Sequence, residues 1–180
     1  MIRRYYATKD NTITNAFEEN LTSRGTGSNM GASDIVEIFS IYAQATSGSS
    51  ELARILIEFD IDSIKSDRSA GLLPASGSVS WYLNMYNAPH SQTVPSNFTL
   101  EALAISTPWE EGYGLDMEFY EDETKGGIGS NWINASGTPR KEITRFEFQG
   151  ESYLSGYSSN NPATRFISIY SLTTLHQFFF

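Results

Sequence analysis

The chain of 180 residues contains no cysteine, which excludes disulfide bonds, thiolate zinc sites and cysteine nucleophiles. It has only two histidines, His90 and His176, so a three-histidine zinc site is excluded as well. No run of eighteen or more apolar residues occurs, and we therefore expect no membrane-spanning helix. The opening MIRRYYATKDN has no apolar stretch behind its arginines, so no secretory signal peptide is expected.

Basic residues are scarce. The chain has 12 Lys and Arg against 21 Asp and Glu, which gives a net charge of −9. Binding to phosphate requires clustered Lys and Arg, so we expect neither nucleic acid nor a membrane surface as a partner. The apolar fraction of 39% and the aromatic fraction of 13% are sufficient for a packed interior. The length fits a single domain spanning residues 1–180.

Helical signals are also rare. The segment ITNAFEENLTSR (13–24) predicts one or two helical turns capped by Thr14 or Asn15. Alternation of apolar and polar residues dominates instead, with clusters of Gly, Ser, Asn and Pro between the alternating segments. The chain is therefore predicted to be all-β, an antiparallel β-sandwich or jelly roll. Besides the strand in RILIEFDIDSI, the predicted strands cover residues 35–42, 78–86, 97–105, 142–149 and 165–172.

The stretch RILIEFDIDSI (54–64) predicts a strand that runs directly into a turn. Asp60 and Asp62 are short acceptors that suit an Asx-type turn, and this structural role is the preferred interpretation. Calcium binding by Asp60, Asp62 and Asp67 is a weaker alternative, because carboxylates gather there without the spacing of a known calcium loop. No other cofactor is expected.

Two further acidic segments were candidates for chemistry. DMEFYEDET (116–124) is predicted to be a solvated acidic loop. In PWEEG, Glu110 and Glu111 would point to opposite faces of a strand, so they cannot flank one glycosidic bond. Trp109 beside them is predicted to lie in the core or at its edge, with sugar stacking as the alternative. No Ser-His-Asp pattern is recognisable, and the protein is predicted not to be an enzyme.

Several segments, taken in order, resemble the DNRLRE-type β-sandwich modules, a jelly-roll family related to carbohydrate-binding modules. They are KDNTITNAF, GSNMGASDIVEI with its Asn-x-Gly-x-Ser turn, ELARILIEFDIDSI, VSWYLNMYN, TLEALAISTPWEEG and SNWINAS. The arrangement, including YYATKDNTITNAF and GSNMGASDI, is also similar to structural proteins of marine tailed bacteriophages, particularly those infecting cyanobacteria. The resemblance covers residues 5–136. Residues 137–180 diverge from it, because the strand of the form D-V-T-x-x-V-x-x-W is absent.

This resemblance implies a non-enzymatic virion protein, a head-decoration, fibre or tube subunit that binds copies of itself and other virion proteins. The tail FISIYSLTTLHQFFF would be either the last strand of its own sandwich or an arm that adds to a neighbour's sheet. A terminus with three phenylalanines is prone to aggregation unless it is covered. The predicted interface residues are Tyr5, Tyr6, Phe178, Phe179 and Phe180.

The alternative hypothesis is a carbohydrate-binding module that uses exposed aromatic side chains as platforms for sugar rings. The candidates are Tyr82, Tyr86 and Tyr113; the competing interpretation is that the first two pack beneath a loop. The expected lack of a signal peptide and of an attached enzyme domain favours the virion hypothesis. A virion protein that touches host glycans would combine the two.

Overall fold

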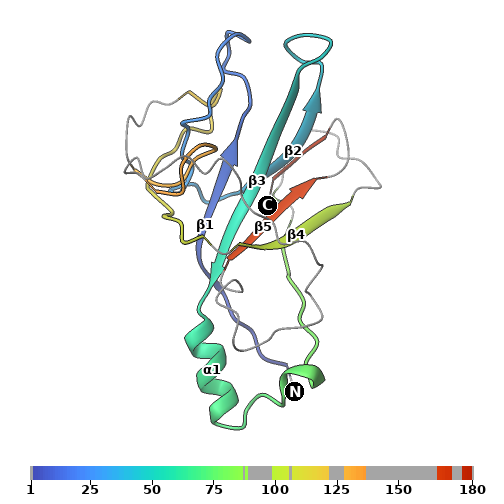
Figure 1. Cartoon of the computed structure of the whole chain (residues 1–180), viewed down its shortest axis with the longest axis vertical. Helices are drawn as coiled ribbons and strands as arrows, with labels where there is room; N and C mark the ends of the chain where they lie inside the picture. The colour runs from blue at the N-terminus through green and yellow to red at the C-terminus, as the bar shows by residue number, and fades with distance from the viewer. Residues whose placement is uncertain are drawn as a thin grey trace.

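The structure is a computed structural model, and it describes residues 2–86, 88, 99–105, 107–121, 128–136, 166–171 and 176–179 (Figure 1). The predicted strand at 142–149 lies outside these residues. Within these residues, six strands form one antiparallel sheet and helix is confined to two short elements. The elements are β1 (Ala7–Thr14), β2 (Glu37–Tyr42), β3 (Ser50–Phe59), α1 (Ile61–Ser69), the 3-10 turn η1 (Ser76–Ser78), β4 (Leu100–Ile105), β5 (Phe166–Ser171) and β6 (His176–Phe179).

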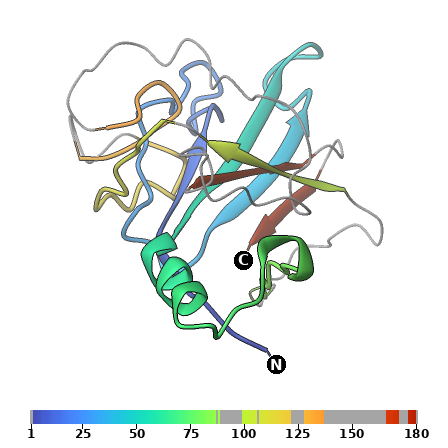
Figure 2. The ribbon, with the colours of Figure 1, turned by 60° about the horizontal axis from the view of Figure 1, so that its bottom comes forward.

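The long strand β3 organises the sheet. Its first residues, Ser50–Leu52, pair with β2, and its remaining residues pair with β1 and with β5. The strand order is β4-β5-β3-β2-β6, with β1 paired to β3 beside this path (Figure 2). The prediction of an all-β chain is confirmed at the level of an open antiparallel sheet with little helix. No helix among the described residues is long and apolar enough to cross a membrane.

Both faces of β3 are buried, because its alternating side chains serve two different clusters. Ile55 and Ile57 pack with Ile38 of β2. Leu56, on the opposite face, packs with Ile13 of β1 and with Trp109. Full burial of such a side chain contributes about 1.5–3 kcal/mol. The predicted alternation is therefore correct, and the predicted core position of Trp109 is confirmed by its exposure of only 4%.

The end of β3 leads into a helix. Asp60 is the N-cap of α1, and its Oδ1 accepts hydrogen bonds from the backbone N–H groups of Asp62 (3.0 Å) and Ser63 (3.3 Å). The Ser63 hydroxyl and these backbone donors lower the pKa of Asp60. The predicted role of Asp60 as a backbone acceptor is correct, but the chain continues as α1 for two turns rather than as a single turn.

The helix predicted at residues 13–24 is wrong. Ile13 and Thr14 complete β1 instead, where both are fully buried. Asn20 then forms an Asx turn, because its side-chain oxygen accepts from the backbone N–H groups of Thr22 (2.7 Å) and Ser23 (2.8 Å). The Asn side chain thus satisfies backbone donors in a conformation that competes with helix.

Candidate binding surfaces

A buried asparagine connects three loops beside β1. Asn29 is 1% exposed, and its Nδ2 donates to the carbonyl oxygens of Glu111 and Ser130, both at 2.8 Å. Its Oδ1 accepts from the backbone N–H groups of Gly114 (2.8 Å) and Gly31 (3.2 Å). One amide therefore joins the loops 25–33, 110–117 and 128–136, which gather beside β1 in Figure 1.

Two more buried side chains complete what we call the asparagine hub, defined as Asn11, Asn29 and Asp116. Asn11 on β1 donates to the Ser130 carbonyl oxygen at 2.9 Å and accepts from the Met30 backbone N–H at 3.0 Å. Asp116 accepts from the Asn29 backbone N–H at 3.0 Å. The hub attaches the three loops to the sheet through side chains. A buried polar group left without a partner costs about 1–3 kcal/mol, so the loss of one of these side chains would destabilise the fold.

The structure corrects the prediction that residues 116–124 form a solvated acidic loop, because Asp116 is buried. This carboxylate is only 5% exposed and bonds to Asn29, so it does not belong to a solvated acidic loop. Glu118 and Glu121 of the same segment are exposed, as expected for such a loop. Residues 122–124 of the segment lie outside the described residues.

Glycine permits the close approach of the loops to the hub. A Cβ on Gly31 would lie 2.1 Å from the Glu111 carbonyl oxygen. A Cβ on Gly129 would lie 2.5 Å from the Gly112 Cα. Sequence reasoning took the Asn-x-Gly-x-Ser motif at Asn29 for a turn and missed its buried amide. The available signal was the recurrence of glycine in all three loops.

The loops of the hub display apolar side chains to solvent. Tyr113 is 69% exposed and Leu115 is 63% exposed, while Gly114 between them faces the hub.

Phe119 and Tyr120 both have left-handed backbone conformations, with φ of 53° and 54°. Tyr120 is held there from several sides, because its hydroxyl donates to Glu37 Oε2 at 3.1 Å, its ring contacts Phe39, and its carbonyl oxygen accepts from Ser28.

Tyr82 and Tyr86 are the most exposed tyrosines of the described residues, at 83% and 85%. They lie in the segment 79–86, which alternates half-buried and exposed side chains as predicted but pairs with no described strand. Leu83 and Met85 of this segment pack against the cluster around Ile55. The alternation turns both tyrosines to solvent, and no loop of the described part of the chain covers them.

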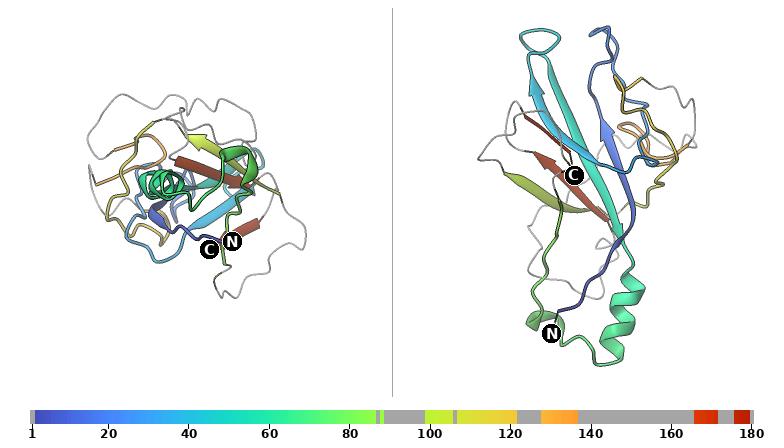
Figure 3. Two further views of the ribbon diagram at one scale, coloured as in Figure 1. Left: turned by 90° about the horizontal axis from the view of Figure 1, so that it is seen from below. Right: turned by 180° about the vertical axis from the view of Figure 1, so that it is seen from behind.

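The three predicted platform tyrosines do not form one surface. The segment 79–86, drawn in green, and the loops of the hub, in yellow and orange, lie in different parts of the molecule in both Figure 1 and the rear view of Figure 3. Tyr82 and Tyr86 are four residues apart in an extended segment, which corresponds to about 13 Å. Tyr113 belongs to the hub loops instead.

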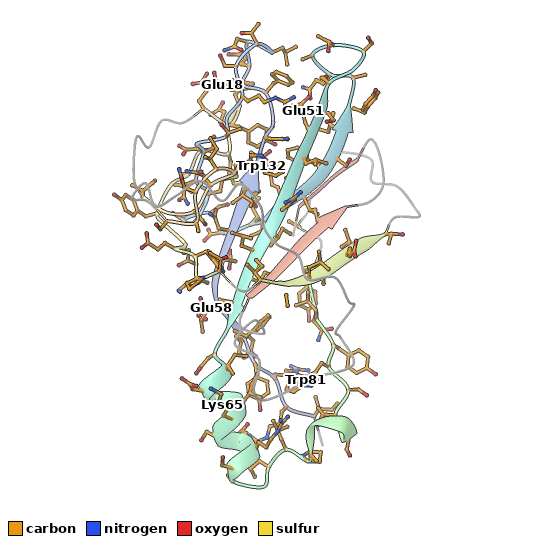
Figure 4. All side chains as sticks on the ribbon, in the orientation of Figure 1. Glu18, Glu51, Glu58, Lys65, Trp81 and Trp132 are labelled. Carbon is orange, nitrogen blue, oxygen red and sulfur yellow. The ribbon has the colours of Figure 1, made fainter. Side chains whose placement is uncertain are left out.

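Near the N-terminus, Tyr5 and Tyr6 have different environments. The Tyr5 hydroxyl donates to Asp67 Oδ2 at 2.7 Å and its ring lies 6.2 Å from that of Trp81, at the helical end of the molecule (Figure 4). Burial, followed by the hydrogen bond to Asp67, raises the pKa of Tyr5. Tyr6 is 78% exposed. Tyr5 is thus half-buried and bonded to Asp67, whereas Tyr6 presents most of its side chain to solvent.

The three calcium candidates do not converge. Asp60 caps α1, Asp62 forms an ion pair with Lys65 at 3.0 Å, and Asp67 accepts from Tyr5. No group of three or more acidic, histidine or cysteine side chains suited to a metal occurs within the described part of the chain. The three carboxylates are engaged instead in a helix cap, an ion pair and a hydrogen bond to the N-terminal segment.

The tail residues occupy two strands. β5 pairs with β3 and β4, and β6 pairs with β2, where Phe178 lies opposite Ile38 and Phe179 opposite Glu37. In this single chain the backbone thus places the tail in the chain's own sheet, beside β2, β3 and β4. Phe180 and His90 lie outside the described residues.

Comparisons of the chain with protein-family models, with curated proteins and with solved structures find no match. The resemblance to β-sandwich modules and to phage structural proteins therefore stays a prediction.

Proposed function

We propose that the protein is a non-enzymatic structural protein of a virion, a head-decoration, fibre or tube subunit that binds copies of itself and other virion proteins. The observation that supports this most is the lack of charge in the tail. All 12 basic and 21 acidic residues precede residue 166, yet the tail supplies β6, which ends the order of the described strands. Natural proteins usually protect edge strands with charges or proline, and an uncharged edge is prone to pair with another chain.

The proposal includes closure of the sheet into a β-sandwich or jelly roll. Two features support it. β2 and β5 pair with successive parts of β3, and Ile38 of β2 packs on the same cluster as the half-buried Leu100 of β4. Strands that divide a shared neighbour and cover the same apolar side chains are typical of two layers that face each other.

The direct test is the mass of the purified protein, measured by size-exclusion chromatography with light scattering and viewed by electron microscopy. The informative variant ends at Leu175 and lacks only β6 and Phe180. Removal of residues 166–180 would also remove β5 from between β3 and β4, and a loss of assembly would then reflect unfolding. We expect ordered assemblies of the full chain and smaller or weaker assemblies of the shortened chain, which keeps β5 but lacks β6.

A matched control for the shortened chain is the double variant Tyr82→Ser/Tyr86→Ser, which alters an exposed aromatic surface away from β6. It should assemble like the unmodified protein. Monomers of the unmodified protein at all concentrations would overturn the proposed function, whereas unchanged assembly of the chain that ends at Leu175 would show that β6 is not required for it.

The second candidate function, glycan binding, is supported by a different observation. Tyr82 and Tyr86 expose more than four fifths of their surface on the same side of one extended segment. An aromatic ring with a polar hydroxyl offers a flat apolar face together with a hydrogen-bonding edge. A glycan array with the unmodified protein and with Tyr82→Ala/Tyr86→Ala tests this; binding that persists in the variant, or no binding at all, would overturn the platform. Tyr113→Ala is the matched control.

A further inference from the structure

The strand β5 lies in the interior of the sheet, in a position between β3 and β4 that we call the slot. It pairs with β3 along Arg54–Glu58 on one side and with β4 along Leu100–Ile105 on the other. Ile167, for example, lies opposite Ile57 of β3 and opposite Ala104 of β4. Figures 1 and 2 show β5 between these two strands. Among the described strands, β4 pairs with β5 alone, so the tail attaches β4 to the sheet.

The walls of the slot and the strand that fills it come from distant parts of the chain. Both walls precede residue 106, whereas the filling strand begins at Phe166. The 29 residues from 137 to 165 separate the described loop that ends at Ser136 from β5. Fully extended, this number of residues spans about 100 Å, and a domain of 180 residues has a radius of gyration of about 16 Å. Chain length thus permits the tail to reach its own slot or that of a neighbour.

The bonds that hold the tail do not depend on which copy supplies it. β5 and β6 join the sheet through backbone ladders, and a backbone ladder forms equally well within a chain or between chains. Charge favours contact through this segment. A chain of net charge −9 repels its copies, but the residues from Phe166 onward add no charge to that repulsion.

We infer that β5 and β6 are exchanged between copies of the protein, so that Phe166–Phe179 of one copy completes the sheet of another. The inference rests on the proposed self-assembly and names the segment that carries it. Each copy then has both a tail to donate and a slot to be filled. Sequential exchange links copies head to tail into a ring or a filament, the kind of contact that builds repeating particles.

Mixed disulfide formation tests the exchange. Two variants, Ala104→Cys and Ile167→Cys, each carry one cysteine in a chain that otherwise has none. The two positions are direct partners across β4 and β5, and Ala104 is exposed. Direct antiparallel partners have Cα atoms about 4.5–5.5 Å apart, which is within the range that a disulfide bridges. The two variants are unfolded together, refolded, oxidised and separated on a non-reducing gel.

The expected result is a covalent dimer that contains one chain of each variant, identified by mass spectrometry. The matched control pairs Ala104→Cys with Ser171→Cys; Ser171 lies opposite Leu100 at the other end of β4, so no mixed dimer is expected. If Ile167→Cys fails to fold, the facing pair Glu101→Cys and Tyr170→Cys replaces it.

Light scattering on the same samples distinguishes a failure of strand exchange from a failure of self-assembly. Assemblies without a mixed dimer, together with an internal disulfide in the Ala104→Cys/Ile167→Cys double variant, would overturn strand exchange and leave the proposed function standing. Monomers throughout would overturn both. Assemblies with a mixed dimer support both.

Discussion

The loops of the asparagine hub and the C-terminal strands are both attached to the sheet from far away in the sequence, but by different bonds. The loops depend on particular side chains, since Asn29 alone makes four hydrogen bonds to three loops. The strands β5 and β6 depend on backbone pairing with β2, β3 and β4. The first kind of attachment requires one residue at one position. The second accepts any extended segment of suitable pattern, including one from another copy.

Replacement of Asn29 should have the largest effect. Asn29→Ala leaves the backbone N–H groups of Gly31 and Gly114 and two carbonyl oxygens without the amide, so we expect a loss of about 3–5 kcal/mol in the free energy of unfolding. Urea denaturation measures it. The control, Asn20→Ala, removes an exposed turn asparagine and should cost no more than about 1 kcal/mol. Equal losses in the two variants would contradict the special position of the hub.

Replacement of Gly31, the glycine of the Asn-x-Gly motif, should have the next largest effect on stability. A Cβ on Gly31 meets the Glu111 carbonyl oxygen, a backbone atom that cannot move without moving the loop. We expect Gly31→Ala to lower the free energy of unfolding by about 1–3 kcal/mol. In Gly48→Ala the new Cβ has no atom within 4 Å, so its stability should be nearly unchanged. A neutral Gly31→Ala would show that the loops are not closely packed.

A single charge introduced on β6 should weaken assembly and leave the stability of the folded chain nearly unchanged. His176, the first residue of β6, lies opposite Ser40. We expect His176→Lys to lower the mass of the assemblies in light scattering, because an edge lysine opposes pairing with another chain. The thermal unfolding of the monomer should change little. The control Tyr82→Lys adds the same charge on the exposed segment and should assemble normally; loss of assembly in both variants would indicate simple charge repulsion.

The smallest expected effect concerns Asp10 on β1. Burial, and then the negative charge of Glu111, raise the pKa of Asp10 above its ordinary value. Since the folded state holds this proton more tightly than the unfolded state, the contribution of Asp10 to stability is fully present below pH 3.8 and is lost as the pH rises through the raised pKa.

Asp10→Asn should therefore be more stable than the unmodified protein at pH 7, and this difference should vanish at pH 3. Thermal melts at the two pH values measure it. A variant that is less stable at pH 7 would show that the carboxylate has a favourable partner in the folded protein.

The strands β2 to β5 were predictable because their signal is local, whereas the strand predicted at 78–86 pairs with no described strand. In β3, Ile55, Ile57 and Phe59 repeat with the two-residue period that is typical of a strand. The helix α1 was missed because IDSIKSDRS carries only two apolar residues, of which Ile64 alone is buried. Its N-cap was recognisable as a backbone acceptor, although a cap and an Asx turn have the same sequence signal.

The asparagine hub was not predictable from the order of residues. Asn29 bonds to residues 82 to 101 positions away in the sequence, and an asparagine between glycines ordinarily indicates a turn. Asp116 was assigned to a solvated loop for the same reason, since four other acidic residues follow it closely and nothing local shows that one of them is buried. Which chain supplies β5 is likewise independent of any local pattern.

The most direct test of self-assembly is the mass of the unmodified protein over a wide concentration range, measured by light scattering after size-exclusion chromatography. Self-assembly predicts a mass that is a large multiple of 20.0 kDa and that rises with concentration. A mass of 20.0 kDa at every concentration would contradict it.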